Sequence, residues 1–145
     1  MNRITPIART LLGLGFVVFA TNYFFPFLPA QPLPEPAALA FLGAFKASGL
    51  LTFIKVIELA AGLALVANRA VPLALTLLAP VLVGIAGFHV AFDPKGLSIV
   101  GVLIALELVL AWSYRAAFAP MLRARVTPDP IVGGTRTPPL AIARG

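Results

Sequence analysis

Three charged side chains stand inside apolar runs of the sequence. Lys55 and Glu58 lie three residues apart in the run over residues 49–67, and Glu107 stands in a later run. A charged group inside a membrane costs at least ~2.5–3.5 kcal/mol, and such groups usually face the protein interior, pair with one another and mark a functional site. A carboxyl group can transfer protons, and an ammonium group can donate hydrogen bonds to a ligand. These three residues are therefore the first candidates for a ligand or proton site.

Helical spacing adds further polar residues to this group. Residues three and four apart share one face of a helix, which predicts an inward-facing stripe of five residues, namely Ser48, Thr52, Lys55, Glu58 and Gly62. At ~1.5 Å per residue, Glu58 and Glu107 each lie roughly 14–15 Å from the outer ends of their helices, near the centre of a ~30 Å hydrocarbon core. The two carboxyl groups are thus expected at similar depth.

Each predicted helix contributes a polar residue to the outer half of the protein. His89 lies just inside the outer end of the third helix, and Asn22 lies just inside that of the first. We therefore predict an outward-opening ligand or proton pocket formed by Asn22, Thr52, Lys55, Glu58, His89 and Glu107. The alternative is structural: the three charged groups would form an ion network that fixes helix register, and His89 would be a hydrogen-bonded interface residue.

Several chemistries are excluded by residue types. The chain has no cysteine and a single histidine, so it is not expected to carry an iron–sulfur cluster, haem or zinc, and no metal site is predicted. No nucleophile motif, phosphate-binding loop or dinucleotide fingerprint is present, and no catalytic residue is assigned. Gly13 and Gly15 fall inside an apolar run, where we interpret them as residues of close helix packing.

Composition indicates an all-α integral membrane protein. Of 145 residues, 60% are hydrophobic and 11% charged, with a mean hydropathy of +1.00, whereas soluble proteins have about 25% charged residues. Residues 10–34 and 70–92 carry no Asp, Glu, Lys or Arg, and both stretches exceed the ~18 apolar residues needed to span a bilayer. Two further runs reach this length when their charged residues are accepted. The sequence thus predicts a four-transmembrane-helix bundle over residues 1–125, with helices at about 7–25, 49–67, 72–92 and 97–118.

Prolines mark the segments between the predicted spans. Residues 26–36 contain five prolines, which predicts an extended segment, and Pro36 is suited to the first position of a helix. Residues 37–46 are too few to span, so we predict a short outer interfacial helix with Phe41 and Phe45 facing acyl chains; a short core helix is the alternative. Pro80 and Gly84 are expected to bend or loosen the third helix. Residues 126–145 are predicted to be a Pro-rich cytoplasmic tail without a core.

The basic residues predict the orientation in the membrane. All eight Arg flank one side of the predicted spans, namely Arg3, Arg9, Arg69, Arg115, Arg123, Arg125, Arg136 and Arg144. Only Lys46 and Lys95 fall on the opposite side, which predicts that both termini are cytoplasmic. The charge is distributed around spans and not over one soluble face, so nucleic acid is not an expected partner. A cleaved secretory signal ending near Ala20 is the alternative for the first run, but the run is long for a signal core.

Motifs distributed over residues 5–125 resemble those of the DoxX family of small four-helix membrane proteins. The resemblance is carried by Ala8-Arg-x-Leu-Leu-Gly13, Asn22-Tyr-Phe-Phe25, Phe41-Leu-Gly-Ala44, Ser48-Gly49, Lys55-Val-Ile-Glu58 with Gly62, Asn68-Arg69, Val71-Pro-Leu-Ala74, Phe88-His89 and Leu106-Glu107. Gly84 departs from the family, in which a polar residue often precedes the histidine by about one turn.

The resemblance implies a multi-pass protein of the bacterial plasma (inner) membrane. Some members are membrane subunits of quinone-linked oxidoreductases, so the expected function is to bind a quinone or similar lipophilic ligand, or to anchor a redox partner, without catalytic cofactors of its own. The expected partners are membrane lipids and other membrane or redox subunits. Two alternatives stay open: a structural or assembly subunit of a larger membrane complex, and a small proton-coupled carrier using Glu58 and Glu107.

Overall fold

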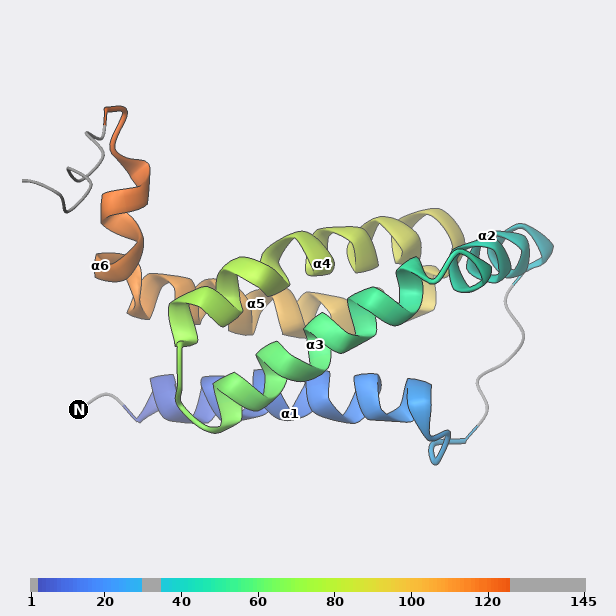
Figure 1. Ribbon diagram of the computed structural model, residues 1–145, viewed down its shortest axis with the longest axis horizontal. Helices are drawn as coiled ribbons and strands as arrows, with labels where there is room; N and C mark the ends of the chain where they lie inside the picture. The colour runs from blue at the N-terminus through green and yellow to red at the C-terminus, as the bar shows by residue number, and fades with distance from the viewer. Residues whose placement is uncertain (1–2, 30–34, 126–145) are drawn as a thin grey trace, which may run out of the picture.

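The structure, a computed structural model, describes residues 3–29 and 35–125. All regular elements within these ranges are helical, as the composition predicted (Figure 1). In chain order they are α1 (Ile4–Phe24), α2 (Pro36–Ala47), α3 (Leu50–Val66), α4 (Val71–Phe92), the 3-10 turn η1 (Pro94–Gly96), α5 (Leu97–Ser113), α6 (Arg115–Phe118) and the 3-10 turn η2 (Ala119–Leu122).

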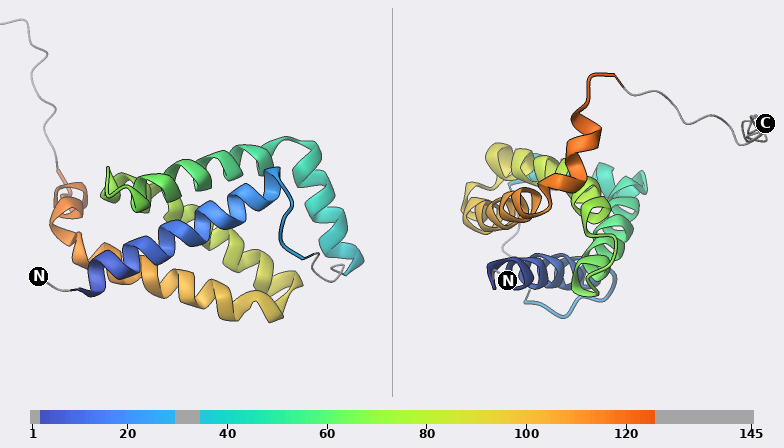
Figure 2. Two further views of the ribbon diagram at one scale, coloured as in Figure 1. Left: turned by 90° about the horizontal axis from the view of Figure 1, so that it is seen from below. Right: turned by 90° about the vertical axis from the view of Figure 1, so that its left-hand side faces the viewer.

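Four of these helices pack side by side in a ring. Helix α1 packs most extensively against α3, α3 also packs against α4, α4 packs against α5, and α5 returns to α1 (Figure 2, right). Helices α3 and α5 therefore face each other diagonally, as do α1 and α4. Helix α2 lies at the end of the ring remote from the N-terminus (Figure 1); we call this the α2 end. The opposite end holds the start of α1, the α3–α4 turn and α6.

Three helical segments are long and apolar enough to cross a membrane, namely α1, α4 and Pro94–Ser113. A fourth span is obtained if α2 and α3 are counted together, although they are bent by 79°. Large apolar side chains such as Phe53, Val83 and Leu108 are exposed on the outside of the ring, where lipid would cover them. These features are those of a membrane protein.

The bend between α2 and α3 occurs at a glycine. Gly49 has a φ of 79°, in the left-handed region where a Cβ is strained. The N–H of Gly49 bonds to the carbonyl of Lys46, and Ser48 Oγ accepts the N–H of Leu50. The change of direction is thereby hydrogen-bonded, and α3 begins immediately after it.

The hydrophobic core occupies the half of the ring away from α2. Its buried members are Ala8, Leu12 and Phe16 of α1, Ala61 and Leu65 of α3, Val71, Ala74, Leu75, Leu78 and Leu82 of α4, and Leu110 of α5. Helices α3 and α4 are described throughout. Helix α4 has no buried residue after Leu82, and α3 has no buried residue before Glu58. On α3 and α4 the buried residues are thus confined to the half away from α2, whereas Ala20 of α1, Ala38 of α2 and Val100 of α5 are buried near the α2 end.

Helices α1 and α3 approach closely at two glycines. A Cβ added to Gly13 would lie 2.8 Å from the Gly62 carbonyl oxygen, and a Cβ added to Gly62 would lie 2.9 Å from that of Gly13. Real Cβ atoms do not approach so closely, so neither position has room for a larger residue. This confirms the interpretation of Gly13 as a packing residue, whereas Gly15 makes only an ordinary contact with Leu103.

One helix differs from its predicted form. Instead of one helix over 97–118, α5 ends at Ser113 and α6 turns away from it (Figure 1). Ser113 Oγ donates to the Val109 carbonyl, and Arg115 donates to the Trp112 carbonyl; side chains that bond nearby carbonyls in this way compete with helix continuation. Helix α4 is continuous through Pro80, and the bend or loosening expected there stays a prediction. The predicted tail at 126–145 lies outside the described residues.

Candidate functional site

Lys55 and Glu58 form an ion pair within α3. Lys55 Nζ lies 2.7 Å from Glu58 Oε2, and the side chains are 18% and 2% exposed respectively. Glu58 shares its face of α3 with the buried Ala61, Gly62 and Leu65. A buried carboxylate is tolerated when a cation pairs with it, so Lys55 compensates the burial of Glu58. This is the pair that the sequence spacing predicted to share a face.

Glu107 is buried without such a partner. It is 8% exposed and lies on the face of α5 that carries Leu103 and Leu110, which both belong to or pack against the core. Within the described residues its Oε2 atom has no hydrogen-bond partner. A buried polar group left unsatisfied costs about 1–3 kcal/mol, and native proteins keep few of them. Glu107 is therefore the polar group whose presence in the interior most requires a functional reason.

The two buried carboxyl groups lie on diagonally opposed helices. Glu58 is eight residues from the start of α3 and Glu107 is ten residues from the start of α5, which corresponds to about 12 and 15 Å at 1.5 Å per residue. Both helices start at the α2 end (Figure 1). Each carboxyl group lies one helical turn before a core residue of its own helix, Ala61 or Leu110. On α3 Glu58 is the first buried residue, whereas on α5 Val100 and Leu103 continue the apolar packing toward the α2 end.

Asn22 and Thr52 are engaged in local structure. Asn22 Oδ1 accepts the N–H groups of Phe27 and Leu28, at 2.9 and 2.8 Å, and so fixes the turn that follows α1. Thr52 Oγ1 lies 2.7 Å from the Tyr23 hydroxyl, which ties α3 to α1. The structure therefore gives both residues a positioning task at the α2 end, and their hydrogen bonds among the described residues do not include the charged pair.

His89 is held at the end of α4 by partners that sequence reasoning did not name. Its Nδ1 lies 3.1 Å from Asp93 Oδ2 and 3.1 Å from the Asp93 carbonyl oxygen. The ring also rests against Gly96, where a Cβ would collide with it. The four-residue spacing of His89 in the last turn of α4 and Asp93 directly after the helix was the signal that could have identified this pair.

The predicted residues thus separate into three groups: Lys55 with Glu58, Glu107 alone in the interior, and Asn22, Thr52 and His89 in local contacts at the α2 end. Among the described residues no three His, Asp or Glu side chains converge as a metal site would require. Two hollows lie at the opposite end, one lined by Pro6, Ile7, Thr10 and Leu11, the other by residues of α5, α6 and η2.

Arg9 has a second role that its position in the sequence does not reveal. Arg9, interpreted from sequence as a flanking charge, donates to the carbonyl oxygens of Leu65 and Val66 at the end of α3. Such carbonyls have no partner within their own helix, so Arg9 caps α3 from α1.

Compared with known proteins, the chain matches no family model, no curated protein and no solved structure.

Proposed function

We propose that the chain is a DoxX-like, four-span protein of the bacterial plasma membrane, with both termini cytoplasmic, that binds a quinone or similar lipophilic ligand in the half of the ring near α2. It would serve as a membrane subunit of a quinone-linked complex, with the redox cofactor on another subunit. The observation that carries the proposal is Glu107, a buried carboxyl group with an unpartnered oxygen, on the helix diagonal to the Lys55–Glu58 pair.

The three charged groups match the chemistry of a quinone. A quinone presents carbonyl oxygens that need donors, and a quinol presents hydroxyl groups that need acceptors. Lys55 has three N–H donors, of which the ion pair with Glu58 uses one. Glu107 offers a free acceptor to a quinol hydroxyl. Reduction of a quinone consumes two electrons and two protons; the electrons would come from the redox partner, and Glu107 would transfer protons.

The packing of the ring supports access for such a ligand. Helices α3 and α4 have no buried residues between the carboxyl level and the α2 end, so their packing there is looser than in the core. Exposed apolar side chains such as Phe53 and Val90 continue along the outside of these helices. An isoprenoid tail could lie against them, with the ring reaching inward.

Two other functions remain as alternatives. A structural or assembly subunit is favoured by the Lys55–Glu58 pair, which is complete within one helix and needs no ligand. A proton-coupled carrier would use the same two carboxyl groups at similar depth. Neither alternative predicts selective binding of a quinone. Quinone binding therefore distinguishes the proposal from both alternatives.

Quinone titration of the purified protein in lipid nanodiscs tests the proposal. We expect saturable binding of a short-tailed quinol, weakened at least about tenfold in Glu107→Leu, because a hydrogen bond to a charged or buried group contributes about 1.5 kcal/mol or more. Glu35→Gln, which removes a carboxyl group at the start of α2, is the matched control and should bind as the wild type does. Absence of saturable binding, or equal binding by Glu107→Leu, would favour an assembly subunit or carrier.

A further inference from the structure

Among the described residues, the end of the ring opposite to α2 carries charge of a single sign. The described arginines at this end are Arg3, Arg9, Arg69, Arg115, Arg123 and Arg125. The described acidic residues, Glu35, Glu58, Asp93 and Glu107, all lie at the α2 end or within the ring. Arg9 is engaged with the carbonyls of α3, and none of the other five has an acidic partner within residues 3–29 and 35–125. Such an arrangement favours an anionic partner.

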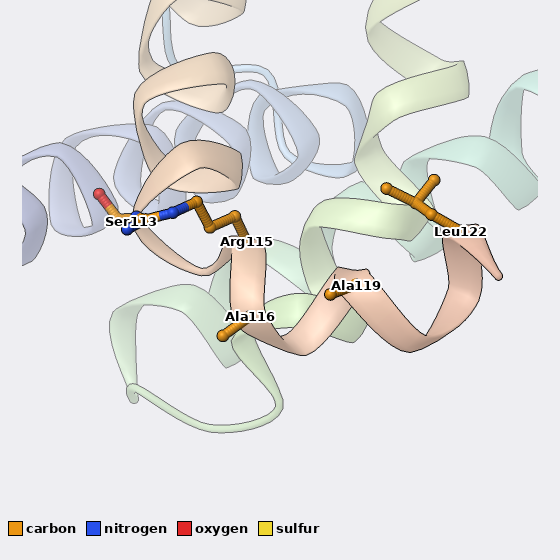
Figure 3. A pocket seen from close by; sticks show the side chains of 5 residues that line it. All are labelled: Ser113, Arg115, Ala116, Ala119 and Leu122. Carbon is orange, nitrogen blue, oxygen red and sulfur yellow. The ribbon is translucent and has the colours of Figure 1, made fainter.

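A hollow beside these arginines is formed where α5 breaks. It has a volume of about 600 Å³ and is lined by Ser113, Arg115, Ala116, Ala119 and Leu122 (Figure 3). Ala116 and Ala119 contribute only small side chains to the lining. The Ser113 hydroxyl donates to the Val109 carbonyl and accepts from Thr5, whereas Arg115 uses one N–H on the Trp112 carbonyl and keeps the other donors of its guanidinium. The hollow therefore presents a guanidinium group.

Large apolar side chains flank the same hollow. Trp112, Met121 and Leu122 are 73%, 67% and 84% exposed. Arg115 lies 5.2 Å from the centre of the Trp112 ring and donates to the Trp112 carbonyl. Tryptophan is enriched where a membrane meets water, and an arginine beside exposed apolar groups at that level faces phosphates and acyl chains at once.

We propose that this hollow binds an anionic glycerophospholipid, with its phosphate held by Arg115 and attracted by the charge of Arg123, which follows the lining residue Leu122, and with its acyl chains against Trp112 and Leu122. A soluble anionic ligand would gain no binding energy from the three exposed apolar side chains. A zwitterionic lipid, which has no net charge, would gain little from the cluster of arginines at this end. Arginine suits the phosphate because its planar guanidinium forms two parallel hydrogen bonds. The inference is independent of the quinone proposal, which concerns the other half of the ring.

Trp112 provides the readout, because it is the single tryptophan of the chain. We would measure quenching of its fluorescence in nanodiscs that contain brominated phosphatidylglycerol or brominated phosphatidylcholine at equal mole fractions. Quenching by the anionic lipid should reach half its maximum at a mole fraction at least fivefold lower, since each arginine near a membrane surface contributes roughly a fivefold preference. The preference should shrink at high salt, which screens charge.

Substitutions distinguish lipid binding from the ordinary placement of arginines on one side of a membrane. Arg123→Gln should lose most of the preference. Arg115→Lys keeps the charge but loses the planar fork, so it should weaken the preference without changing membrane insertion. The matched control, Lys95→Gln in η1 at the α2 end, should leave it intact. Equal quenching by both lipids in the wild type, or an unchanged preference in both arginine variants, would overturn the proposal.

Discussion

Glu58 and Glu107 are both buried carboxyl groups, but they differ in their partners. Glu58 is matched by Lys55 at 2.7 Å, whereas Oε2 of Glu107 has no partner in the described part of the chain. Loss of Lys55, which leaves Glu58 unpaired, and loss of Glu107 should therefore have opposite effects on stability. The contrast allows the structural and the functional charge to be separated by experiment.

Loss of Lys55 should destabilise the protein. Lys55→Met leaves Glu58 buried and unpaired, which costs about 3 kcal/mol, and the expected result is a lower midpoint of thermal unfolding in mild detergent. The double variant Lys55→Met with Glu58→Met should recover at least half of this loss, because it removes both charges. A double variant that is less stable than Lys55→Met alone would show that Glu58 has further partners.

Loss of Glu107 should instead stabilise the protein. Glu107→Leu removes an unsatisfied polar atom at nearly constant volume, so thermal unfolding should shift upward by the equivalent of about 1–2 kcal/mol. Stability gained together with loss of ligand binding is the pattern expected of a functional residue. If Glu107→Leu is as destabilising as Lys55→Met, then Glu107 has a structural partner and the proposed role is wrong.

Residue-level prediction from sequence succeeded where spacing within one helix decides the contact. The three-residue separation of Lys55 and Glu58 was sufficient to predict a shared face, and the structure shows the pair. The lining of a pocket by Asn22 and Thr52 stays a prediction, and the structure adds bonds that spacing did not predict, to backbone N–H groups and to Tyr23. Short polar side chains near helix ends bond to whatever backbone lies closest, and this depends on turn geometry that spacing does not contain.

At the scale of elements, the packing of α1 on α3 depends on Gly13 and Gly62. Gly62→Ala places a methyl group 2.9 Å from the Gly13 carbonyl oxygen, and the helices must separate to accept it. We expect a destabilisation of about 1–3 kcal/mol, the usual cost of overpacking, measured by thermal unfolding in detergent.

Gly84→Ala is the matched control for this prediction. A Cβ at Gly84 meets nothing within 4 Å, and alanine favours helix by about 1 kcal/mol over glycine, so stability should be unchanged or higher. Equal losses in Gly62→Ala and Gly84→Ala would contradict the close approach of α1 and α3.

The helices themselves followed from apolar runs and prolines, because a chain inside lipid must satisfy its backbone hydrogen bonds internally. The end of α5 at Ser113 did not, since no glycine or proline follows it before Pro120 and only the bonds of Ser113 and Arg115 reveal the break. The break between an outer helix over 37–46 and a span from 49 was predicted, but the 79° angle between the two helices was beyond composition. It depends on a single left-handed residue.

At the scale of the whole molecule, orientation in the membrane is a prediction from charge alone. The native chain has no cysteine, so a cysteine introduced at Lys95 can be labelled selectively. With both termini cytoplasmic, an impermeant thiol reagent should label Lys95→Cys from outside intact cells. Labelling only after the cytoplasmic side is opened would show that the orientation is the reverse of the predicted one. Each proposed site would then face the compartment opposite to the one proposed.

The location of the ligand relative to the ring is the central claim, and photoaffinity labelling tests it most directly. A photoreactive quinone added to the protein in nanodiscs should label peptides from residues 50–58 and 97–107, near Glu58 and Glu107. Excess unlabelled quinone should compete this labelling away, and Glu107→Leu should reduce it, whereas Glu35→Gln should not. Labelling spread over the lipid-facing residues of every helix, unaffected by competitor, would contradict the account.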